Sequence, residues 1–390
     1  MNSSKQRLKI CYIIDNLSFR GGERVFAQLA TGLDPAQYDV TVACSPGGPF
    51  VEFLEAANIR VVPFNMRPQF NPIALIRLTA FLRQEQFDII HCQGRGDPYG
   101  RVAATLAGAP LIISTAAAIV SRYWVSSRLR KLMYWLIDRV TDRMVDHWLV
   151  LNQLSVEVLC QDHHISPTKI SIIPNGIEVE RYDPYLSGSA GQQINPLRIR
   201  QELKLERDVP LIGAVGRLAW EKGFSYLLDA MPAVLATHPE AHLLIAGNGE
   251  LETELKEQAQ RLGIAHRCHF LGFRKDIPDI LAALDLFVLS SLIEGMPMVM
   301  LEAMAASKPI VATKIPGAVD VLEDGVDGLL VGKEDAQALA SAINQLLADH
   351  SQAQRLGEAA RRKALGEYTV ERMVERTRQL YHDLLQEDKK

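Results

Sequence analysis

Short, continuous apolar runs alternate with amphipathic stretches along the chain, and this alternation limits the possible folds more than any other feature. Leu8–Ile14, Val40–Cys44 and Asp88–Cys92 are such runs. Because apolar residues dominate them without regular polar alternation, we expect strands that are buried on both faces. Asn71–Gln86 lies between two of these runs and has the apolar spacing of a helix. The sequence therefore predicts an α/β fold with two Rossmann-like, parallel, doubly wound sheets.

The length of 390 residues exceeds that of a usual domain, so we expect two domains. Residues 183–196 break the alternation because they are rich in glycine, serine and proline, and the alternation restarts at Leu211–Val215. The resulting prediction has four parts: an N-terminal domain at 1–182, a linker or surface loop at 183–197, a C-terminal domain at 198–368, and a final helix at 369–390 that packs back on the N-terminal domain.

Charge and composition exclude several classes of protein. The net charge of −4 argues against a protein that wraps nucleic acid. The five cysteines are an odd number without a close pair, so we expect no disulfide framework and a reducing compartment. Residues 1–9 do not resemble a secretory signal. Val102–Ser121 is uncharged, but Gly108 and Pro110 interrupt it, which favours a helix end, a turn and a strand over a membrane span. We expect a cytoplasmic protein.

Ligands of open α/β sheets bind beyond the carboxyl ends of strands, so residues that follow predicted strands are the functional candidates. Gly21 and Gly22 precede a predicted helix and could let backbone N–H groups approach an anion, although an ordinary strand-to-helix turn is an equal alternative. Arg217 and Lys222 follow another strand and could converge on a pyrophosphate. Taken alone, they are better explained as solvated surface cations.

Two short turns are weaker candidates. Gly247, Asn248 and Gly249 follow a strand directly, and taken alone they are best explained as a tight turn. Phe273 and Arg274 follow the next strand and offer backbone groups and one guanidinium where a base could lie.

The most specific segment begins after a strand that ends near Ser290. Pro297 suits the first turn of a helix, whose N–H groups could bind phosphate. Glu302 lies on this helix, about 7 Å further along the axis, where a carboxylate could accept both hydroxyls of a ribose. Glu294 would face the sugar on the other side of the phosphates. The candidate phosphate-binding and sugar-binding residues are Gly295, Met296, Pro297, Met298 and Val299.

Taken together, these segments resemble the GT-B-fold retaining glycosyltransferases of family 4. The resemblance covers nearly the whole chain in order, and single motifs are weak while the ordered set is strong. The matching segments are Gly21–Arg24, Ile173–Ile177, Val215–Leu218, Glu221–Gly223, Ala246–Gly249, Leu271–Phe273, the E-x7-E pair Glu294 and Glu302, Lys308-Pro309, Gly317 and Asp327–Leu330.

The resemblance implies a nucleotide-diphosphate sugar as donor, held mainly by the second domain. Arg217 and Lys222 would neutralise the diphosphate, Glu302 would hold the ribose and Glu294 the sugar hydroxyls. The backbone near Phe273 would hold the base. Family members need no metal and no other cofactor, and they retain the anomeric configuration through front-face attack, in which the departing phosphate takes the acceptor proton.

Two stretches in the first domain qualify this picture. Many relatives carry a histidine after the fifth strand, and Ala117 stands at that position here. Residues 122–139 mix basic and aromatic side chains, which suits either a helix on an anionic membrane leaflet or one that is packed on a single face. The acceptor would be a glycan or a lipid-linked glycan.

Histidines offer no metal site. His91 ends a predicted strand, where it could face a ligand or be satisfied by the backbone. His163, His164, His266 and His269 lack metal-ligand spacing, so we interpret them as surface or edge residues.

The prediction is a metal-independent glycosyltransferase in the cytoplasm or at the inner face of its membrane, active in polysaccharide or lipopolysaccharide biosynthesis. Two alternatives stay open: a nucleotide-sugar epimerase of the same fold, and a nucleotide-sugar-binding subunit with impaired catalysis.

Overall fold

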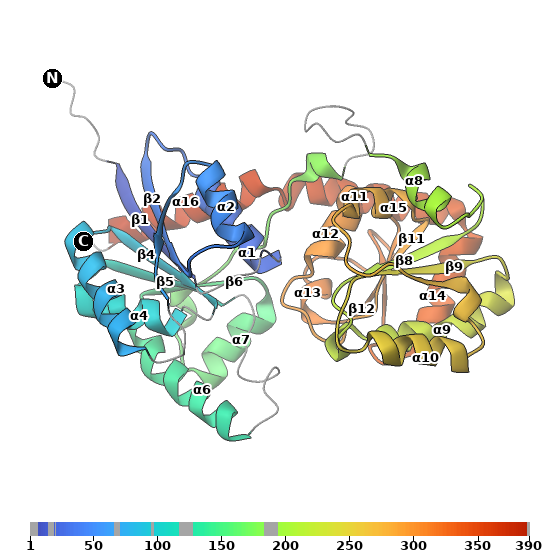
Figure 1. Cartoon of the computed structure of the whole chain (residues 1–390), viewed down its shortest axis with the longest axis horizontal. Helices are drawn as coiled ribbons and strands as arrows, with labels where there is room; N and C mark the ends of the chain where they lie inside the picture. Colours follow the sequence, from blue (N-terminus) through green and yellow to red (C-terminus); the bar gives the residue numbers. More distant parts are fainter. Residues whose placement is uncertain are drawn as a thin grey trace. The chain divides into compact units, whose positions relative to one another are not determined.

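The computed structural model describes residues 7–14, 19, 21–65, 71–94, 97–116, 128–182 and 194–387, without the side chains of 128–134 and 387. The chain divides into two compact units (Figure 1). Unit 1 holds the residues up to Gly176 and those from Val370 onward, and unit 2 holds Ile177–Thr369. Most of the predicted linker, residues 183–193, lies outside the described part of the chain.

Unit 1 is built on a parallel sheet with the strand order β3-β2-β1-β4-β5-β6-β7. Its strands are β1 (Leu8–Ile14), β2 (Tyr38–Cys44), β3 (Arg60–Pro63), β4 (Ile89–Gln93), β5 (Leu111–Ala116), β6 (His147–Val150) and β7 (Ile170–Ile172). The central strand β1 pairs through Ile10 with Val40 on one side and with Ile89 on the other. Its residues from Ile10 to Ile14 are buried, as the continuous apolar run predicts.

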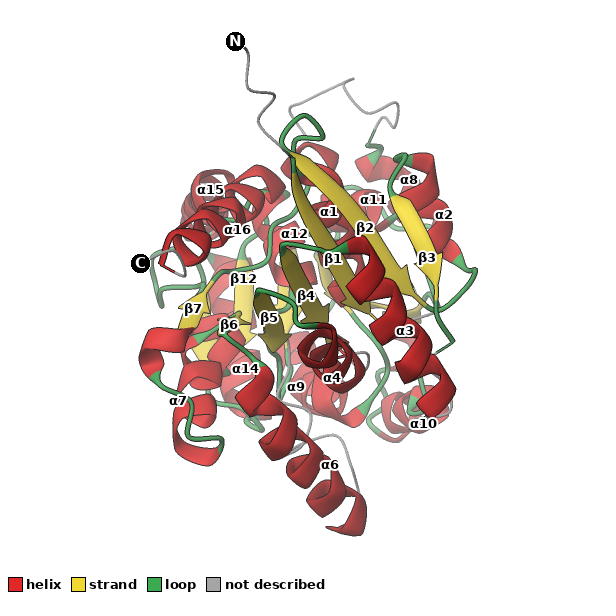
Figure 2. Cartoon of the chain, turned by 90° about the vertical axis from the view of Figure 1, so that its left-hand side faces the viewer, coloured by secondary structure: helices red, strands yellow, loops and turns green. Residues whose placement is uncertain are grey.

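Helices cover both faces of this sheet. They are α1 (Gly21–Gly32), α2 (Pro49–Ala56), α3 (Pro72–Glu85), α4 (Asp97–Ala107), α6 (Arg128–Thr141), α7 (Gln153–Asp162) and α16 (Val370–Glu387). Helices α3 and α4 lie side by side, α4 also contacts α6, and α16 packs against α1 (Figure 2).

A chain of buried hydrogen bonds anchors α16 in unit 1. The Tyr381 hydroxyl lies 3.0 Å from the Tyr12 hydroxyl and 2.6 Å from His91 Nδ1. The other ring nitrogen of His91 lies 2.6 Å from Thr115 Oγ1. Burial lowers the pKa of His91 to about 3, so the ring is neutral and can donate only one of its two hydrogen bonds. Side chains rather than backbone groups therefore satisfy this histidine, which is fully buried.

Unit 2 repeats the architecture with a parallel sheet in the order β10-β9-β8-β11-β12-β13. Its strands are β8 (Leu211–Val215), β9 (His242–Ala246), β10 (Cys268–Phe270), β11 (Leu286–Leu289), β12 (Ile310–Thr313) and β13 (Leu329–Val331). Its helices are α8 (Pro196–Glu202), α9 (Phe224–Thr237), α10 (Glu252–Arg261), α11 (Ile277–Ala283), α12 (Met298–Ala305), α13 (Pro316–Val319), α14 (Ala336–Ala348) and α15 (His350–Glu367). The prediction of two parallel, doubly wound sheets is confirmed.

The uncharged stretch at 102–121 is described as far as residue 116. Helix α4 ends at Ala107, Gly108 takes a left-handed φ of 75°, and β5 begins at Leu111, as the sequence predicts. In the described part of the chain, no helix is both long and apolar enough to cross a membrane.

Candidate active site

Five loops follow the carboxyl ends of neighbouring strands in unit 2, and they pack backbone to backbone. A Cβ atom on Gly247 would lie 1.8 Å from the carbonyl oxygen of Gly216, and one on Gly223 would lie 2.1 Å from that of Ser290. Both glycines also have positive φ values, 143° and 60°. Each position therefore needs glycine for close approach as well as for its backbone conformation.

The predicted Gly247-Asn248-Gly249 turn holds two of these loops together. The N–H of Gly247 donates to the Gly272 carbonyl at 2.8 Å, and the N–H of Leu218 donates to the Asn248 carbonyl at 3.0 Å. A Cβ atom on Gly249 would lie 2.3 Å from the Leu218 carbonyl oxygen. In the structure this turn packs neighbouring loops together, and its role in binding a ligand stays a prediction.

Arg217 and Lys222 come from the loop after β8, and each is paired with a carboxylate. Arg217 donates to Glu221, whose side chain is only 2% exposed. Lys222 Nζ donates to Glu294 Oε1, which also accepts from Ser291 Oγ at 2.9 Å. Glu221 and Ser291 were not predicted as site residues, although they lie only four and three residues from their partners Arg217 and Glu294.

The Lys222–Glu294 pair rests on a rigid frame. The carbonyl of Glu221 accepts from the Leu292 N–H at 2.8 Å, and the carbonyl of Lys222 accepts from Ser290 Oγ at 2.9 Å. These bonds tie the loop after β8 to the loop after β11, so the cation and the carboxylate are positioned together.

Helix α12 begins beside this pair. Pro297 occupies the N-cap position, and no side chain among the described residues caps the helix. The first N–H groups of the helix, at Met298 and Val299, therefore lie at its positive end without a capping side chain. Met296 and Pro297 are buried, whereas Gly295, Met298 and Val299 are partly exposed. A Cβ atom on Gly317 would lie 2.4 Å from the Gly295 carbonyl oxygen, so the next loop closes on this turn.

Glu302 lies on α12 and accepts a 2.7 Å hydrogen bond from the Tyr182 hydroxyl. Tyr182 is buried, so its hydroxyl holds the carboxylate in a fixed orientation. Sequence reasoning missed this tyrosine, which lies 120 residues before its partner and has no motif around it.

Phe273 and Arg274 have different surroundings. Phe273 is 68% exposed. Arg274 donates to both oxygens of Glu202, at 2.6 and 2.9 Å, and to both oxygens of Asp276, at 2.8 and 2.7 Å. These hydrogen bonds raise the pKa of Arg274 and lower those of the two carboxyls. The guanidinium therefore anchors the loop to α8, while the Phe273 ring stays exposed to solvent.

The two remaining candidates, Gly21 and Gly22, belong to unit 1 and begin α1. Gln93 Nε2, at the carboxyl end of β4, donates to the Gly22 carbonyl at 3.4 Å. Ala117, which stands where relatives carry a histidine, lies outside the described residues.

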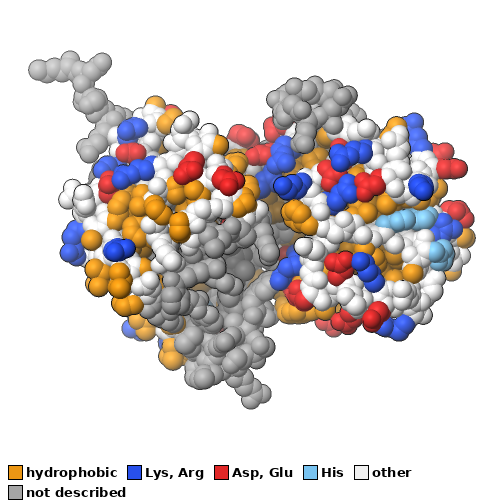
Figure 3. All heavy atoms as spheres, in the orientation of Figure 1, with side chains coloured by type: hydrophobic (Ala, Val, Ile, Leu, Met, Phe, Trp, Pro, Cys, Tyr) orange, Lys and Arg blue, Asp and Glu red, His pale blue; other side chains and the backbone are white. Residues whose placement is uncertain are grey.

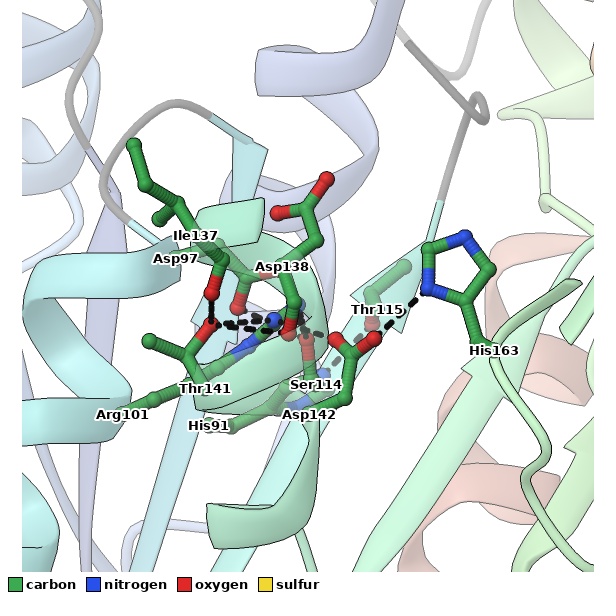
Figure 4. Close-up of polar contacts among 10 residues, drawn as sticks. All are labelled: His91, Asp97, Arg101, Ser114, Thr115, Ile137, Asp138, Thr141, Asp142 and His163. Carbon is green, nitrogen blue, oxygen red and sulfur yellow. Dashed lines mark hydrogen bonds and ion pairs between the residues drawn. The ribbon is translucent and has the colours of Figure 1, made fainter. Parts of the chain in front are cut away.

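A buried polar cluster that sequence reasoning did not predict lies below the end of β5 (Figure 4). Arg101 forms ion pairs with Asp97 and Asp142 and donates to Ser114 Oγ at 2.9 Å. Asp142 also pairs with His163 at 2.6 Å. The interpretation of His163 as a surface or edge residue is wrong, because its side chain is 7% exposed and tied to this carboxylate. The cluster fixes Ser114, and His91 fixes the next residue, Thr115.

The described residues contain no group of three or more His, Cys, Asp or Glu side chains that could hold a metal ion.

Comparison with known proteins places this geometry in a family. The family model of the glycosyl transferases group 1 matches residues 197–363, and that of Glycosyltransferase Family 4 matches residues 19–181. A UDP-Gal:alpha-D-GlcNAc-diphosphoundecaprenol alpha-1,3-galactosyltransferase of Escherichia coli is 27% identical over 99% of both chains. The lipopolysaccharide core biosynthesis glycosyltransferase LpsE of Rhizobium meliloti is 35% identical, over 46% of this chain and 52% of its own length.

Solved structures show the same fold. The structure of Anabaena Alr3699/HepE in complex with UDP superposes with a TM-score of 0.82 at 24% identity, covering 96% of this chain and 100% of that one. The protein thus belongs to the GT-B-fold glycosyltransferases of family 4, and it is a glycosyltransferase.

Proposed function

We propose that this glycosyltransferase transfers a sugar from a nucleotide-diphosphate sugar to a glycan or lipid-linked acceptor with retention of configuration. The observation that carries the proposal is the Lys222–Glu294 pair beside the uncapped start of α12. A cation and a helix N-terminus match a diphosphate, and a carboxylate at hydrogen-bond distance from the cation matches sugar hydroxyls.

The donor phosphates would take over the cations from their present carboxylate partners. Lys222 is on the same loop as Arg217, so one diphosphate can meet both. When Lys222 turns to phosphate, Glu294 keeps the hydrogen bond from Ser291 and becomes free to accept from sugar hydroxyls. The carboxylate thus positions the lysine before the donor binds and the sugar afterwards.

The nucleoside end would lie toward Glu302 and Phe273. Glu302 is oriented by Tyr182, and its carboxylate would accept hydrogen bonds from ribose hydroxyls. Phe273 presents an exposed ring on which the base could lie. The Escherichia coli relative is named for a UDP-galactose donor and the Anabaena structure is a complex with UDP, so a UDP-sugar is the first donor to test.

The proposed reaction depends on stabilising the negative charge of the leaving diphosphate. Two cations and a helix end stabilise the departing diphosphate, so the proposal needs no metal and no other cofactor. Front-face attack through an oxocarbenium-like state retains configuration, and the leaving phosphate takes the acceptor proton.

The acceptor side is proposed by analogy with the Escherichia coli relative, whose name specifies a diphosphoundecaprenol-linked sugar. A lipid-linked acceptor would place the enzyme at the inner face of the cytoplasmic membrane. The predicted contact through 122–139 stays a prediction, because residues 122–127 and the side chains of 128–134 lie outside the described residues.

The test is to incubate the protein with a panel of UDP-sugars and polyprenyl-diphosphate-sugar acceptors, and to measure UDP release and the anomeric configuration of the product. We expect acceptor-dependent UDP release and a retained linkage, unchanged by EDTA. An inverted linkage, or activity abolished by EDTA and restored by a divalent ion, would contradict the proposed mechanism.

Two other results would indicate one of the alternative functions, an epimerase or a binding subunit with impaired catalysis. Formation of an isomerised sugar without acceptor would indicate an epimerase. Tight UDP-sugar binding without any turnover would indicate an impaired binding subunit.

A further inference from the structure

Three neighbouring helices of unit 1 expose large apolar side chains, each of them at least half exposed. These residues are Ile73 and Ile76 on α3, Leu106 on α4, and Leu136 and Val140 on α6. Helix α4 contacts both α3 and α6, and Arg83 of α3 donates to the Leu106 carbonyl of α4 at 2.5 Å. Among the described residues of unit 1, the next most exposed large apolar side chain is Ile172 on β7, which is 43% exposed. The apolar exposure of the unit is therefore concentrated on these three helices.

The exposed side of α3 follows helical spacing. The exposed residues include Ile73, Ile76, Arg77 and Arg83. Ile76 and Arg77 lie one helical turn from Ile73, and Arg83 lies two turns from Ile76. The opposite side carries the buried residues Ala74, Leu78 and Leu82. Asn71 caps the helix by accepting from the N–H groups of Ile73 and Ala74. The helix is thus stably packed on one side, and its solvent side is apolar and basic.

The charged groups that reach solvent from these helices and from the turn after α6 are mainly basic, and Asp146, at the end of that turn, is the one exposed carboxylate among their described residues. Arg77, Arg83 and Arg143 are exposed, and Arg139 lies over the Trp135 ring. The other carboxylates of these segments are less accessible: Asp97 and Asp142 are buried on Arg101, Asp138 is partly buried, and Glu85 holds Arg60 through two hydrogen bonds. The surface is therefore locally positive, although the whole chain carries −4.

Figure 3 shows this pattern where Figure 1 places α3: hydrophobic and basic side chains lie together without an acidic side chain between them.

We propose that this surface, formed by Ile73, Ile76, Arg77, Leu106, Leu136, Val140 and Arg143 and called here the α3–α4–α6 face, docks on an anionic lipid membrane. Single exposed apolar residues are ordinary on soluble proteins, but five on adjacent helices flanked mainly by arginines match the interface of a leaflet. The isoleucine and leucine side chains enter the acyl boundary, while the guanidinium groups reach lipid phosphates.

Charge favours a membrane over other partners. A second copy docked through the same face would set arginines against arginines. A nucleic acid would engage the arginines but offers no apolar layer for the isoleucines. The inference deepens the proposed function, because it rests on a lipid-linked acceptor and gives the enzyme a surface on which to meet it.

Co-sedimentation of the full chain with vesicles tests the proposal. We expect binding to phosphatidylglycerol-containing vesicles, weak binding to phosphatidylcholine vesicles, and a decrease as salt rises. Arg77→Gln and Arg143→Gln should each weaken partitioning by about fivefold at low salt. Ile73→Ser combined with Ile76→Ser should weaken it at both low and high salt, because the apolar contribution is not screened.

Matched controls lie outside the face. Ile172→Ser removes an exposed apolar residue from β7, and Lys169→Gln removes an exposed cation; neither should change binding. Wild-type binding by the double serine variant, equal binding to neutral vesicles, or a dimer in solution that the serine substitutions disrupt would overturn the proposal. Vesicle binding needs no donor, and UDP release with a detergent-solubilised acceptor needs no vesicle, so failure of the docking surface and failure of the proposed function are distinguishable.

Discussion

Each cation of the candidate donor site is already neutralised by a carboxylate of its own unit. Arg217 forms an ion pair with the buried Glu221, and Lys222 forms one with Glu294. These pairs hold the long side chains in place before a ligand arrives, which lowers the entropy lost on binding. They also oppose binding, because a diphosphate must displace one carboxylate partner for each cation that it takes.

The first prediction concerns these two cations. Lys222→Ala and Arg217→Ala should each weaken UDP binding by about 1.5–3 kcal/mol, the usual value of a charge-assisted hydrogen bond. Titration calorimetry with UDP measures the loss. Lys256→Ala is the matched control, because this lysine pairs with Glu252 on α10 and should leave affinity unchanged. Unaltered affinity in both site variants would refute the diphosphate assignment.

The second prediction concerns Tyr182, which orients Glu302. Tyr182→Phe removes the hydroxyl and keeps the ring, so the carboxylate loses its fixed orientation while the core stays packed. We expect UDP to bind roughly tenfold more weakly, with inorganic pyrophosphate affected little. Glu302→Ala should show the same selectivity with a larger loss. Equal weakening of both ligands would remove the ribose role.

Sequence reasoning placed Arg217, Lys222, Glu294 and Glu302 because their motifs are local and ordered along the chain. The pairing of these residues was not predictable in the same way. Two of the bonds involved, Lys222–Glu294 and Tyr182–Glu302, span 72 and 120 residues, and no local pattern encodes such contacts. The residue types at a site are thus easier to predict than the hydrogen bonds that orient them.

At the scale of elements, glycines allow the loops of unit 2 to pack closely against one another. Gly223 has a φ of 60°, and its missing side chain admits the Ser290 carbonyl oxygen, which belongs to the loop that carries Glu294. The sequence predicted turns at such positions correctly, because the strands before them were recognisable. It could not predict which neighbouring backbone fills the space, since that depends on strand order.

The third prediction follows from this packing. Gly223→Ala should lower the free energy of unfolding by about 1–3 kcal/mol or more, because the new Cβ meets a backbone atom at a strained φ. Gly366→Ala is the matched control: nothing lies within 4 Å of its Cβ position on α15, so alanine should stabilise by up to about 1 kcal/mol. Urea unfolding measures both. Similar effects of the two substitutions would contradict the packing role.

The buried cluster that joins α4, α6 and α7 gives the fourth prediction, on pH. The hydrogen bond to Asp142 raises the pKa of His163, and desolvation raises the pKa of Asp138 to about 6. Both groups hold protons more tightly in the folded chain than in the unfolded one. Their stabilising contributions are therefore complete below the ordinary pKa of each group and are lost as pH rises through its folded pKa.

The measurement is thermal unfolding of wild type and His163→Gln across the histidine range. We expect the variant to be less stable below the ordinary histidine pKa, and the gap to narrow as pH rises through the raised value. His350→Gln changes an exposed histidine and should show no such trend. A gap that stays constant with pH would mean that the proton on His163 contributes nothing to stability.

At the scale of the whole molecule, the sequence predicted two parallel sheets because each strand is a recognisable apolar run. The strand order within each sheet, β3-β2-β1-β4-β5-β6-β7 and β10-β9-β8-β11-β12-β13, needed the structure. The polar cluster below β5 was also missed, because buried aspartate, arginine and histidine look like surface residues in a sequence. Conversely, five large apolar residues, which a sequence suggests are buried, are exposed to solvent on α3, α4 and α6.

The position of α16 has a consequence for the order in which the protein can be made. Tyr381 lies fully buried against Tyr12 and His91, so the core of unit 1 includes a residue from the last helix of the chain. During synthesis, the first 176 residues emerge long before this helix, and N-terminal domains usually fold first. Here unit 1 cannot complete its core until the ribosome has translated all of unit 2 and then α16. A message cut short between unit 2 and α16 would therefore damage the unit that was translated first.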